Sequence, residues 1–428
     1  PHLVFPGLRP GESLDRRTEA PERAPLLAAD GQTIAEGPAD ARVQPLTATA
    51  SIAGTLAASD DAAVRESLYA RGFPEDTPVG SNGLERVFEE QLAGRPGGEL
   101  LAGSRVLASS EPRPAAPVET TIVPSVQEAA DVGLAGRLGG VAAMDPRSGE
   151  ILALAGIAFS APQPPGSTFK IVTTAAALED GKVKMSDEYP IETAATIDGV
   201  ELENANGEYC GGTLAEAFAH SCNSVFAPMG VEVGAERLVE EAEQFGWNAD
   251  PGIPGAAEST IPPASEITSP LEVGSTAIGQ YKTLATTLEM ATVAQTIANG
   301  GVRLPATLAP RRGRGDGVRA VSPKVARQIT ELMTGVVAYG TGTLAAVEGV
   351  EVAGKTGTAE LGDTRGDDPE AAARDGDPSN TDAWFTAFAP ADDPRVVVSV
   401  MLVRNGSGGA TAAPAAQGVL VAGLKRES

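Results

Sequence analysis

Three short motifs carry residue types that can do nucleophilic and acid–base chemistry, and the first is Ser-Thr-Phe-Lys at residues 167–170. It follows a Pro-Gly turn signal and opens an apolar stretch that predicts a helix ending near Gly181. In the first turn of that helix Ser167 and Lys170 share one face. A serine hydroxyl needs an adjacent base. Lys170 can be that base if burial or a positive neighbour lowers its pKa well below about 10.4.

The second and third motifs lie far downstream of the first. Ser221-Cys222-Asn223 falls in a predicted helix–helix connection, where Ser221 and Asn223 can point one way and Cys222 the other. Lys-Thr-Gly-Thr at residues 355–358 falls in a predicted strand, where the missing side chain of Gly357 leaves room for a ligand against the backbone. Each motif alone also fits a helix cap or a strand end. Their joint occurrence in this order indicates a single site.

The elements that would position these motifs are read from hydrophobic periodicity and capping signals. Two strands form a hairpin, a capping box at Thr213–Glu216 opens a short helix to His220, and three further strands lie near the C-terminus. Two strands, a block of helices, three strands and a helix imply an antiparallel sheet assembled from both ends of a domain. The fold class is therefore α+β. The predicted spans are a helix at 123–138, strands at 140–145 and 151–155, helices at 283–299 and 322–337, strands at 351–361, 383–389 and 395–403, and a helix at 412–425.

The first part of the chain predicts a separate, smaller domain. Arg23–Gly31 is an apolar run that ends in a tight Asp-Gly turn, and residues 32–35 resume it. Residues 60–72 and 82–94 predict helices, whereas residues 95–118 are rich in Gly and Pro and predict a linker with one edge strand. We therefore expect domains at 1–115 and 116–428.

Composition excludes several classes of function. The chain has 428 residues and a net charge of −25, which argues against nucleic-acid binding and indicates an acidic, solvated surface. Two cysteines and two histidines are too few and too scattered for a zinc site, so neither a metal nor a cofactor is expected. No apolar run has the length of a membrane span. The chain begins at Pro1, from which we expect that an upstream segment is missing.

The three motifs resemble those of the serine acyl transferases that react with penicillin, namely penicillin-binding proteins and serine β-lactamases. The resemblance is most specific to class B penicillin-binding proteins. Arg23–Gly31, Gly83–Gly94 and Thr120–Ala130 are similar to segments of that class. It implies a transpeptidase domain with a central five-stranded antiparallel sheet flanked by helices, together with an N-terminal pedestal-like domain that is not catalytic.

The resemblance also implies a reaction, a setting and partners. The reaction is peptidoglycan D,D-transpeptidation on D-Ala-D-Ala stem peptides, and β-lactam antibiotics would acylate the enzyme. It would occur on the extracytoplasmic face of the bacterial membrane, to which an upstream anchor absent from this chain would hold the protein. Proteins of the division or elongation machinery are possible partners.

The same resemblance implies a role for each motif residue. Ser167 would attack the carbonyl of the penultimate D-Ala, and Lys170 would accept its proton. Ser221 would relay a proton to the leaving D-Ala nitrogen, and Asn223 would hydrogen-bond Lys170 and the substrate amide. Lys355 would keep Lys170 neutral and attract the terminal carboxylate.

The remaining roles fall on residues 356–358. Thr356 and Thr358 would bind that carboxylate, with Gly357 leaving room between them. The backbone N–H groups of Ser167 and Thr358 would form the oxyanion hole.

Alternative functions remain open at this point. A serine β-lactamase needs a second base, for which Glu258 has a suggestive spacing without the asparagine expected after it. A penicillin sensor or scaffold without turnover would share the acylation motifs. A Ser-His-Asp hydrolase has little support, since His220 is the only internal histidine and no Gly-x-Ser-x-Gly occurs.

Two further features have more than one interpretation. Cys210 and Cys222 could form a disulfide or remain two free thiols, and an oxidising extracytoplasmic setting would permit the bridge. Residues 362–382 form an insertion with seven acidic residues. It is read as a mobile, solvated loop, with a rim or gate over a nearby cleft as the alternative.

Overall fold

The computed structural model describes residues 8–311, 313, 315–362 and 377–426. The chain divides into two compact units, Pro1–Thr120 and Thr121–Ser428. Strand β8 (Val118–Glu119) pairs in parallel with β2 (Leu26–Leu27), which keeps this short stretch with the first unit. The division of roles between a pedestal and a catalytic domain stays a prediction.

The first unit is built from short strands and helices. The predicted strand, turn and strand in residues 23–35 are confirmed, because β2 and β3 pair antiparallel. The helix expected at 60–72 is confirmed as α2, which begins after the Asp61 N-cap. The elements are β1 (Leu14–Glu19), β2, β3 (Thr33–Ala35), α1 (Ala50–Ala53), β4 (Leu56–Ala57), α2 (Ala62–Arg71), β5 (Val79–Gly80), α3 (Gly83–Val87), α4 (Glu89–Leu92), β6 (Gly97–Ala102), β7 (Arg105–Ser110) and β8.

The expectation of a linker with one edge strand at 95–118 is wrong. Strands β6 and β7 form a hairpin, and β1 joins them in a three-stranded sheet of order β1-β6-β7. The glycines that suggested a linker are needed for close packing. A Cβ on Gly98 would lie 2.0 Å from the carbonyl oxygen of Arg17 on β1.

The single helix expected at 82–94 is also wrong in part, because it breaks at Phe88 into α3 and α4. Apolar spacing continues across the break, so periodicity could not reveal it. The two N-terminal segments singled out in the sequence meet here. The buried Glu85 carboxylate accepts hydrogen bonds from Arg23 Nε and Arg42 Nε, each at 2.7 Å. The carboxylate buried in this unit is therefore paired with two guanidinium groups.

The second unit confirms most of the predicted elements. The expected hairpin, the three late strands and the C-terminal helix are all present, whereas the helix expected at 123–138 ends at Leu134, since Ala135 is left-handed. The main elements are α5 (Pro124–Leu134), β9 (Gly139–Met144), β10 (Ile151–Gly156), α6 (Lys170–Glu179), β11 (Glu188–Glu192), β12 (Ala194–Ile197), β13 (Val200–Glu203), β14 (Cys210–Thr213), α7 (Leu214–Ala219), α8 (Asn223–Val233), α9 (Ala235–Phe245), α10 (Pro270–Ala277), α11 (Thr287–Ala298), β15 (Val302–Arg303), β16 (Val318–Arg319), α12 (Pro323–Ala338), β17 (Ala353–Glu360), β18 (Thr381–Ala389), β19 (Val396–Leu402) and α14 (Ala413–Lys425).

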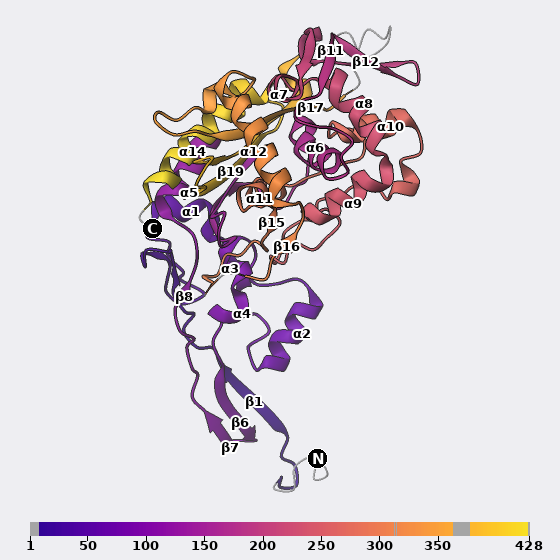
Figure 1. Cartoon of the computed structure of the whole chain (residues 1–428). Helices are drawn as coiled ribbons and strands as arrows, with labels where there is room; N and C mark the ends of the chain where they lie inside the picture. The colour runs from indigo at the N-terminus through magenta and orange to yellow at the C-terminus, as the bar shows by residue number, and fades with distance from the viewer. Residues whose placement is uncertain (1–7, 312, 314, 363–376, 427–428) are drawn as a thin grey trace. The chain divides into compact units, whose positions relative to one another are not determined.

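The core of this unit is a five-stranded antiparallel sheet of order β10-β9-β19-β18-β17. Figure 1 labels two of its strands, β17 and β19. The N-terminal hairpin pairs with the C-terminal strands through β9 and β19, as the sequence predicted. Alternate side chains face opposite layers. Phe385 packs in the hydrophobic cluster with residues of α5 and α14, whereas the hydroxyl of Thr386 donates to Met290 O on α11. The α+β class is confirmed.

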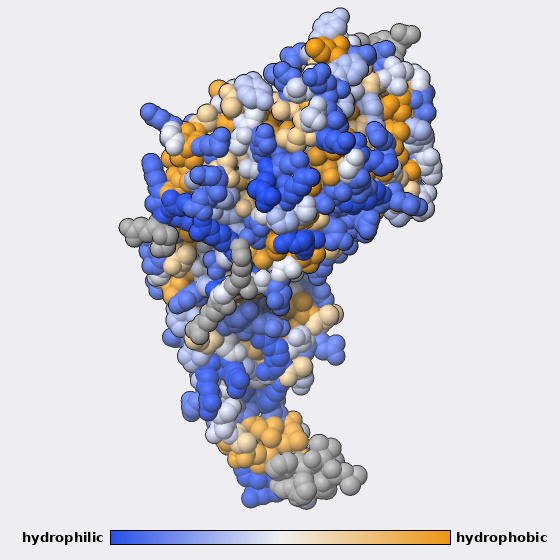
Figure 2. All heavy atoms as spheres, in the orientation of Figure 1, coloured by the Kyte–Doolittle hydropathy of each residue, from blue (hydrophilic) through white to orange (hydrophobic). Residues whose placement is uncertain are grey.

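On the face shown in Figure 2 hydrophilic residues predominate, with smaller hydrophobic patches between them. Across the described part of the chain, no helix combines the length and the apolar character that crossing a bilayer requires.

Candidate active site

Ser167 lies in the 3₁₀ turn η2 (Gly166–Phe169), which leads directly into α6. The backbone N–H of Lys170 donates to Ser167 O, so both residues belong to one turn. Gly166 has a φ of 52° and donates its N–H to Gly279 O at 2.9 Å. Its conformation suits glycine, because a Cβ there would also lie 2.9 Å from Thr358 O. The turn is therefore packed tightly between the loop that contains Gly279 and strand β17.

Gly357 permits the contact between β17 and the Ser167 turn. A Cβ at this position would lie 2.9 Å from Pro165 O and 2.9 Å from Cβ of Trp384. The sequence predicted room for a ligand at Gly357. In the structure this room lets the strand approach the turn that carries Ser167.

The connection between α7 and α8 carries the second motif. The predicted capping box is confirmed, since Thr213 and Glu216 exchange hydrogen bonds at the start of α7. Ser221 follows the helix with a left-handed φ of 63°, and Asn223 opens α8. This sharp turn, which lacks a glycine, directs the Ser221 hydroxyl back toward α6. Such strain in a residue other than glycine is typical of functional sites.

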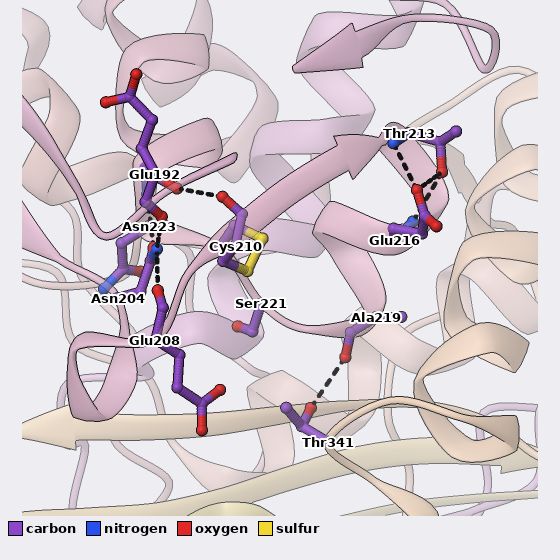
Figure 3. Close-up of a disulfide and its surroundings, with 12 residues drawn as sticks. Glu192, Asn204, Glu208, Cys210, Thr213, Glu216, Ala219, Ser221, Asn223 and Thr341 are labelled. Carbon is purple, nitrogen blue, oxygen red and sulfur yellow. Dashed lines mark hydrogen bonds between the residues drawn. A yellow bond between two sulfur atoms is a disulfide. The ribbon is translucent and has the colours of Figure 1, made fainter. Parts of the chain in front are cut away.

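Cys210 and Cys222 form a disulfide with a Cα–Cα distance of 5.4 Å, which answers the question that the sequence left open. Figure 3 shows the bridge together with Ser221 and Asn223, the residues on either side of Cys222. Because Cys222 bonds to β14, its two neighbours are held in a fixed connection. The disulfide therefore ties the second motif to β14.

Four predicted site residues meet around one hydroxyl. Lys170 Nζ lies 2.6 Å from Ser221 O, 3.3 Å from Ser221 Oγ and 2.7 Å from Asn223 Oδ1. Lys355 Nζ approaches from β17 and donates to Ser221 Oγ at 2.8 Å. Ser167 is partly buried in the turn that begins α6, next to this cluster along the chain. The structure thus brings Lys170, Ser221, Asn223 and Lys355 together through hydrogen bonds, while Ser167 is connected to them through the backbone of the turn that it shares with Lys170.

Burial disfavours the protonated form of both lysines. The side chains of Lys170 and Lys355 are 0% exposed. Burial, with the Lys355 charge as a second cause, holds the pKa of Lys170 well below its usual value. Burial lowers the pKa of Lys355 to about 7. A neutral Lys170 beside a charged Lys355 is the arrangement that a lysine base requires.

The partners of Lys170 define where its lone pair can point. A neutral amine has two N–H donors, and Ser221 O and Asn223 Oδ1 are both acceptors. Donation to these two oxygens leaves the lone pair free for a proton from a hydroxyl. Ser221 Oγ, which already accepts from Lys355, can then donate toward Lys170. The geometry therefore allows a proton to pass between Lys170 and Ser221.

An aromatic ring lies close to the amine of each of the two lysines. The sequence analysis identified neither ring. Lys170 Nζ lies 5.4 Å from the ring centre of Phe226, and Lys355 Nζ lies 5.5 Å from that of Phe218. Such contacts favour the charged forms and partly offset desolvation. Phe218 and Phe226 lie on α7 and α8, one turn before and after the second motif. That helical spacing is the signal that could have found them.

The threonines of the third motif have protein partners. Thr356 Oγ1 lies 2.6 Å from Oγ1 of Thr341, and Thr358 Oγ1 accepts from Gly408 N at 3.4 Å. Asn223 Nδ2 donates to Glu203 O at 2.6 Å, which leaves its second N–H for another acceptor. Thr341 was missed by the sequence analysis. Its position in a Gly-Thr-Gly turn at the end of α12 was the available signal.

The residues behind the alternative functions lie elsewhere. Glu258 and His220 are both exposed, and His220 forms the C-cap of α7. Glu258 therefore receives no support as a second base for a β-lactamase. The acidic insertion falls largely on residues 363–376, which lie outside the described residues.

Comparisons with known proteins agree with this site. Residues 139–420 match the family model described as the penicillin-binding protein transpeptidase domain. Peptidoglycan D,D-transpeptidase PbpA of Mycolicibacterium smegmatis is 34% identical over 419 residues, covering 81% of this chain and 80% of that protein. Its counterpart in Mycobacterium tuberculosis is 35% identical over 420 residues, with the same coverage of 81% and 80%.

A solved structure extends the similarity to three dimensions. The penicillin G acyl-enzyme complex of M. tuberculosis penicillin-binding protein A aligns with a TM-score of 0.74 and 30% identity, covering 94% of this chain and 100% of that chain. The two curated relatives are more than one third identical to this chain and are covered over most of their length. The matched transpeptidase domain also contains all three motifs. The chain belongs to the penicillin-binding protein transpeptidase family, as a class B penicillin-binding protein.

Proposed function

We propose that Ser167 is the nucleophile of a peptidoglycan D,D-transpeptidase and that Lys170 is its base. One observation carries the proposal: Ser221 Oγ lies 3.3 Å from Lys170 Nζ and 2.8 Å from Lys355 Nζ, and Lys170 belongs to the same turn as Ser167. Such an arrangement can accept, hold and return one proton. The substrate is a stem peptide that ends in D-Ala-D-Ala.

The reaction has two steps. Ser167 Oγ loses its proton to Lys170 and forms a bond to the carbonyl carbon of the penultimate D-Ala. The proton then passes through Ser221 to the nitrogen of the terminal D-Ala, the C–N bond breaks, and an ester links the peptide to Ser167. An amine of a second stem peptide attacks that ester, and Ser167 regains a proton as the new amide forms. Backbone N–H groups of Ser167 and Thr358 stabilise the oxyanion in both steps.

The remaining residues bind the donor peptide. Thr356 and Thr358 bind its terminal carboxylate with help from the Lys355 charge, and the free N–H of Asn223 binds a substrate amide. β-Lactams, which form acyl-enzyme complexes with the related M. tuberculosis protein, would acylate Ser167 in the same way. Because peptidoglycan is the substrate, the reaction occurs on the extracytoplasmic face of the membrane, with division or elongation proteins as partners.

The test is covalent labelling by penicillin with mass spectrometry of the adduct. Ser167→Ala should abolish the adduct without unfolding the chain, whereas Ser160→Ala, a nearby exposed serine, should label like the parent protein. An adduct that persists for minutes supports a transpeptidase, and rapid release of hydrolysed penicillin supports a β-lactamase. Turnover of a D-Ala-D-Ala donor with an amine acceptor excludes a sensor. Labelling at a residue other than Ser167 would refute the proposal.

A further inference from the structure

Thr341 links two of the catalytic motifs, although it belongs to none of them. Its hydroxyl oxygen lies 2.6 Å from Thr356 Oγ1 on β17 and 3.2 Å from Ala219 O at the end of α7. Its backbone N–H donates to the same carbonyl at 3.1 Å. Figure 3 shows Thr341 with its contact to Ala219, close to Ser221. A carbonyl at a helix C-terminus needs a partner from outside the helix, and Thr341 supplies it.

Close packing fixes the backbone of Thr341. A Cβ on Gly340 would lie 2.3 Å from Ala219 O, and a Cβ on Gly409 would lie 2.2 Å from Thr341 O. The turn is therefore pressed between the end of α7 and the segment that follows β19. Under these restraints the Thr341 hydroxyl can change its hydrogen-bond partner by rotating its proton, without moving the chain.

Each of the two threonine hydroxyls has only one proton, which restricts what they can do together. If Thr341 donates to Ala219 O, then Thr356 must donate to Thr341 across the 2.6 Å contact. In that arrangement Thr356 has no proton left for a substrate. A carboxylate can only accept hydrogen bonds, so Thr356 must reverse its donation before it can bind one.

We propose that Thr341 is a positioning residue for the terminal carboxylate of the donor, because it donates to Thr356 when Thr356 donates to the carboxylate. This inference rests on the proposed function, in which Thr356 binds that carboxylate. Reversal turns the Thr341 proton from Ala219 O to Thr356 Oγ1. Ala219 O keeps the Thr341 N–H, so no buried acceptor loses its last partner.

The relay favours a charged terminus over a neutral one. A hydrogen bond to an ionised acceptor is roughly twice as strong as one between neutral groups. Donation from Thr341 polarises the Thr356 hydroxyl and strengthens that bond further. An ester or amide terminus offers a weaker acceptor and gains less from the reversal. Thr341 therefore contributes to selection of a free carboxylate in both D-Ala-D-Ala peptides and penicillins.

The experiment compares acylation of the whole chain by benzylpenicillin and by its methyl ester, which lacks the free carboxylate. Thr341→Val keeps the shape of the side chain but removes the hydroxyl, whereas Thr341→Ser keeps the hydroxyl. We expect the valine variant to lose about 5- to 10-fold in the acylation rate constant with benzylpenicillin, the effect of one hydrogen bond. With the methyl ester its rate should equal that of the parent protein. The serine variant should match the parent with both.

A purely structural role for Thr341 gives a different pattern. Loss of the contact to Ala219 would lower the melting temperature and slow both compounds equally, and this outcome overturns the relay. Equal rates of the valine variant and the parent protein with benzylpenicillin overturn it as well. If the valine variant does not fold, Thr341→Ala takes its place in the same comparison. Failure of the proposed function is distinct, because penicillin would then leave Ser167 unmodified in the parent protein.

Discussion

The ammonium group of Lys355 donates to the hydroxyl of Ser221 at 2.8 Å across 134 positions of the chain. This bond joins the third motif to the second. Ser221 in turn lies against Lys170, which belongs to the first motif. Lys355 and Lys170, the proposed base, are therefore connected through one serine.

Replacement of Lys355 should change the pH dependence of acylation. Because the Lys355 charge lowers the pKa of Lys170, Lys355→Met should raise that pKa and leave less neutral base at pH 7. We expect the penicillin acylation rate at pH 7 to fall on the order of 100-fold or more, with the acid limb of the pH profile moved to higher pH. In the parent protein the rate should also decline above about pH 7, where Lys355 loses its proton.

The acylation rate is measured by stopped flow from about pH 5 to about pH 10, a range that includes the pH at which Lys355 loses its proton. These measurements give both limbs of the pH profile. Lys282→Met is the matched control, since Lys282 is exposed. An acid limb that stays in place in the Lys355 variant would show that this charge does not tune Lys170.

A methyl group at Gly357 should disturb catalysis more than folding. In Gly357→Ala the new Cβ would lie 2.9 Å from Pro165 O and from Trp384 Cβ, so β17 must shift away from the Ser167 turn. A misplacement near 1 Å can lower a rate on the order of 100-fold, and we expect a loss of that size in acylation. Gly418→Ala on α14 meets nothing within 4 Å and serves as control. Similar acylation by the two variants would contradict this account of the glycine.

Removal of the disulfide should affect both stability and rate. The bridge closes a loop between residues 12 positions apart, and its loss in a Cys210→Ala, Cys222→Ala double variant should cost about 3 kcal/mol of unfolding free energy. Ser221 and Asn223 would also lose a restraint, so acylation should slow. Chemical denaturation and penicillin labelling, each with and without reductant, provide the measurements. Reductant should have no further effect on the double variant, and an unchanged labelling rate would show that the bridge is only a stabilising element.

Glu289 should make the protein less stable as the pH rises. Among the described residues its Oε1 atom has no hydrogen-bond partner, and burial raises its pKa to about 8, with Arg303 opposing the shift. Between about pH 4.5 and pH 8 the folded state holds a proton that the unfolded state has released, so the free energy of unfolding falls across this window. Glu289→Gln should remove this slope and stabilise the chain by about 1–3 kcal/mol at pH 8.

Denaturation at pH 5 and pH 8 checks the Glu289 prediction. Glu272→Gln is the contrasting variant, because hydrogen bonds from Ser269, Thr268 and Tyr281 lower the pKa of Glu272 to about 2. That carboxylate is ionised in both states over this range, so its replacement should destabilise the chain equally at both pH values. A Glu289 variant with the parent's pH slope would contradict the expected protonation.

Local elements were predictable because their causes are local. The Thr213–Glu216 capping box, the apolar spacing of the helices and the two apolar runs of the β9–β10 hairpin each depend on residues within a few positions of one another. The two strands and three strands at opposite ends of the domain also fixed the α+β class. Failures arose where glycine had a packing role, as at Gly98, or where a helix broke without a change in period, as at Phe88.

The sequence by itself determined which residues could do the chemistry, since Ser167 and Lys170 share one turn and the other two motifs occur in order. Only the tertiary structure decided that Lys355 and Lys170 meet at Ser221, that Cys210 and Cys222 are bonded, and that Thr341 reaches Thr356. These contacts depend on how the sheet edge, α6 and the α7–α8 connection pack against one another. Residue type and spacing encode local conformation, whereas the pKa of a lysine depends on the burial and charges that distant segments supply.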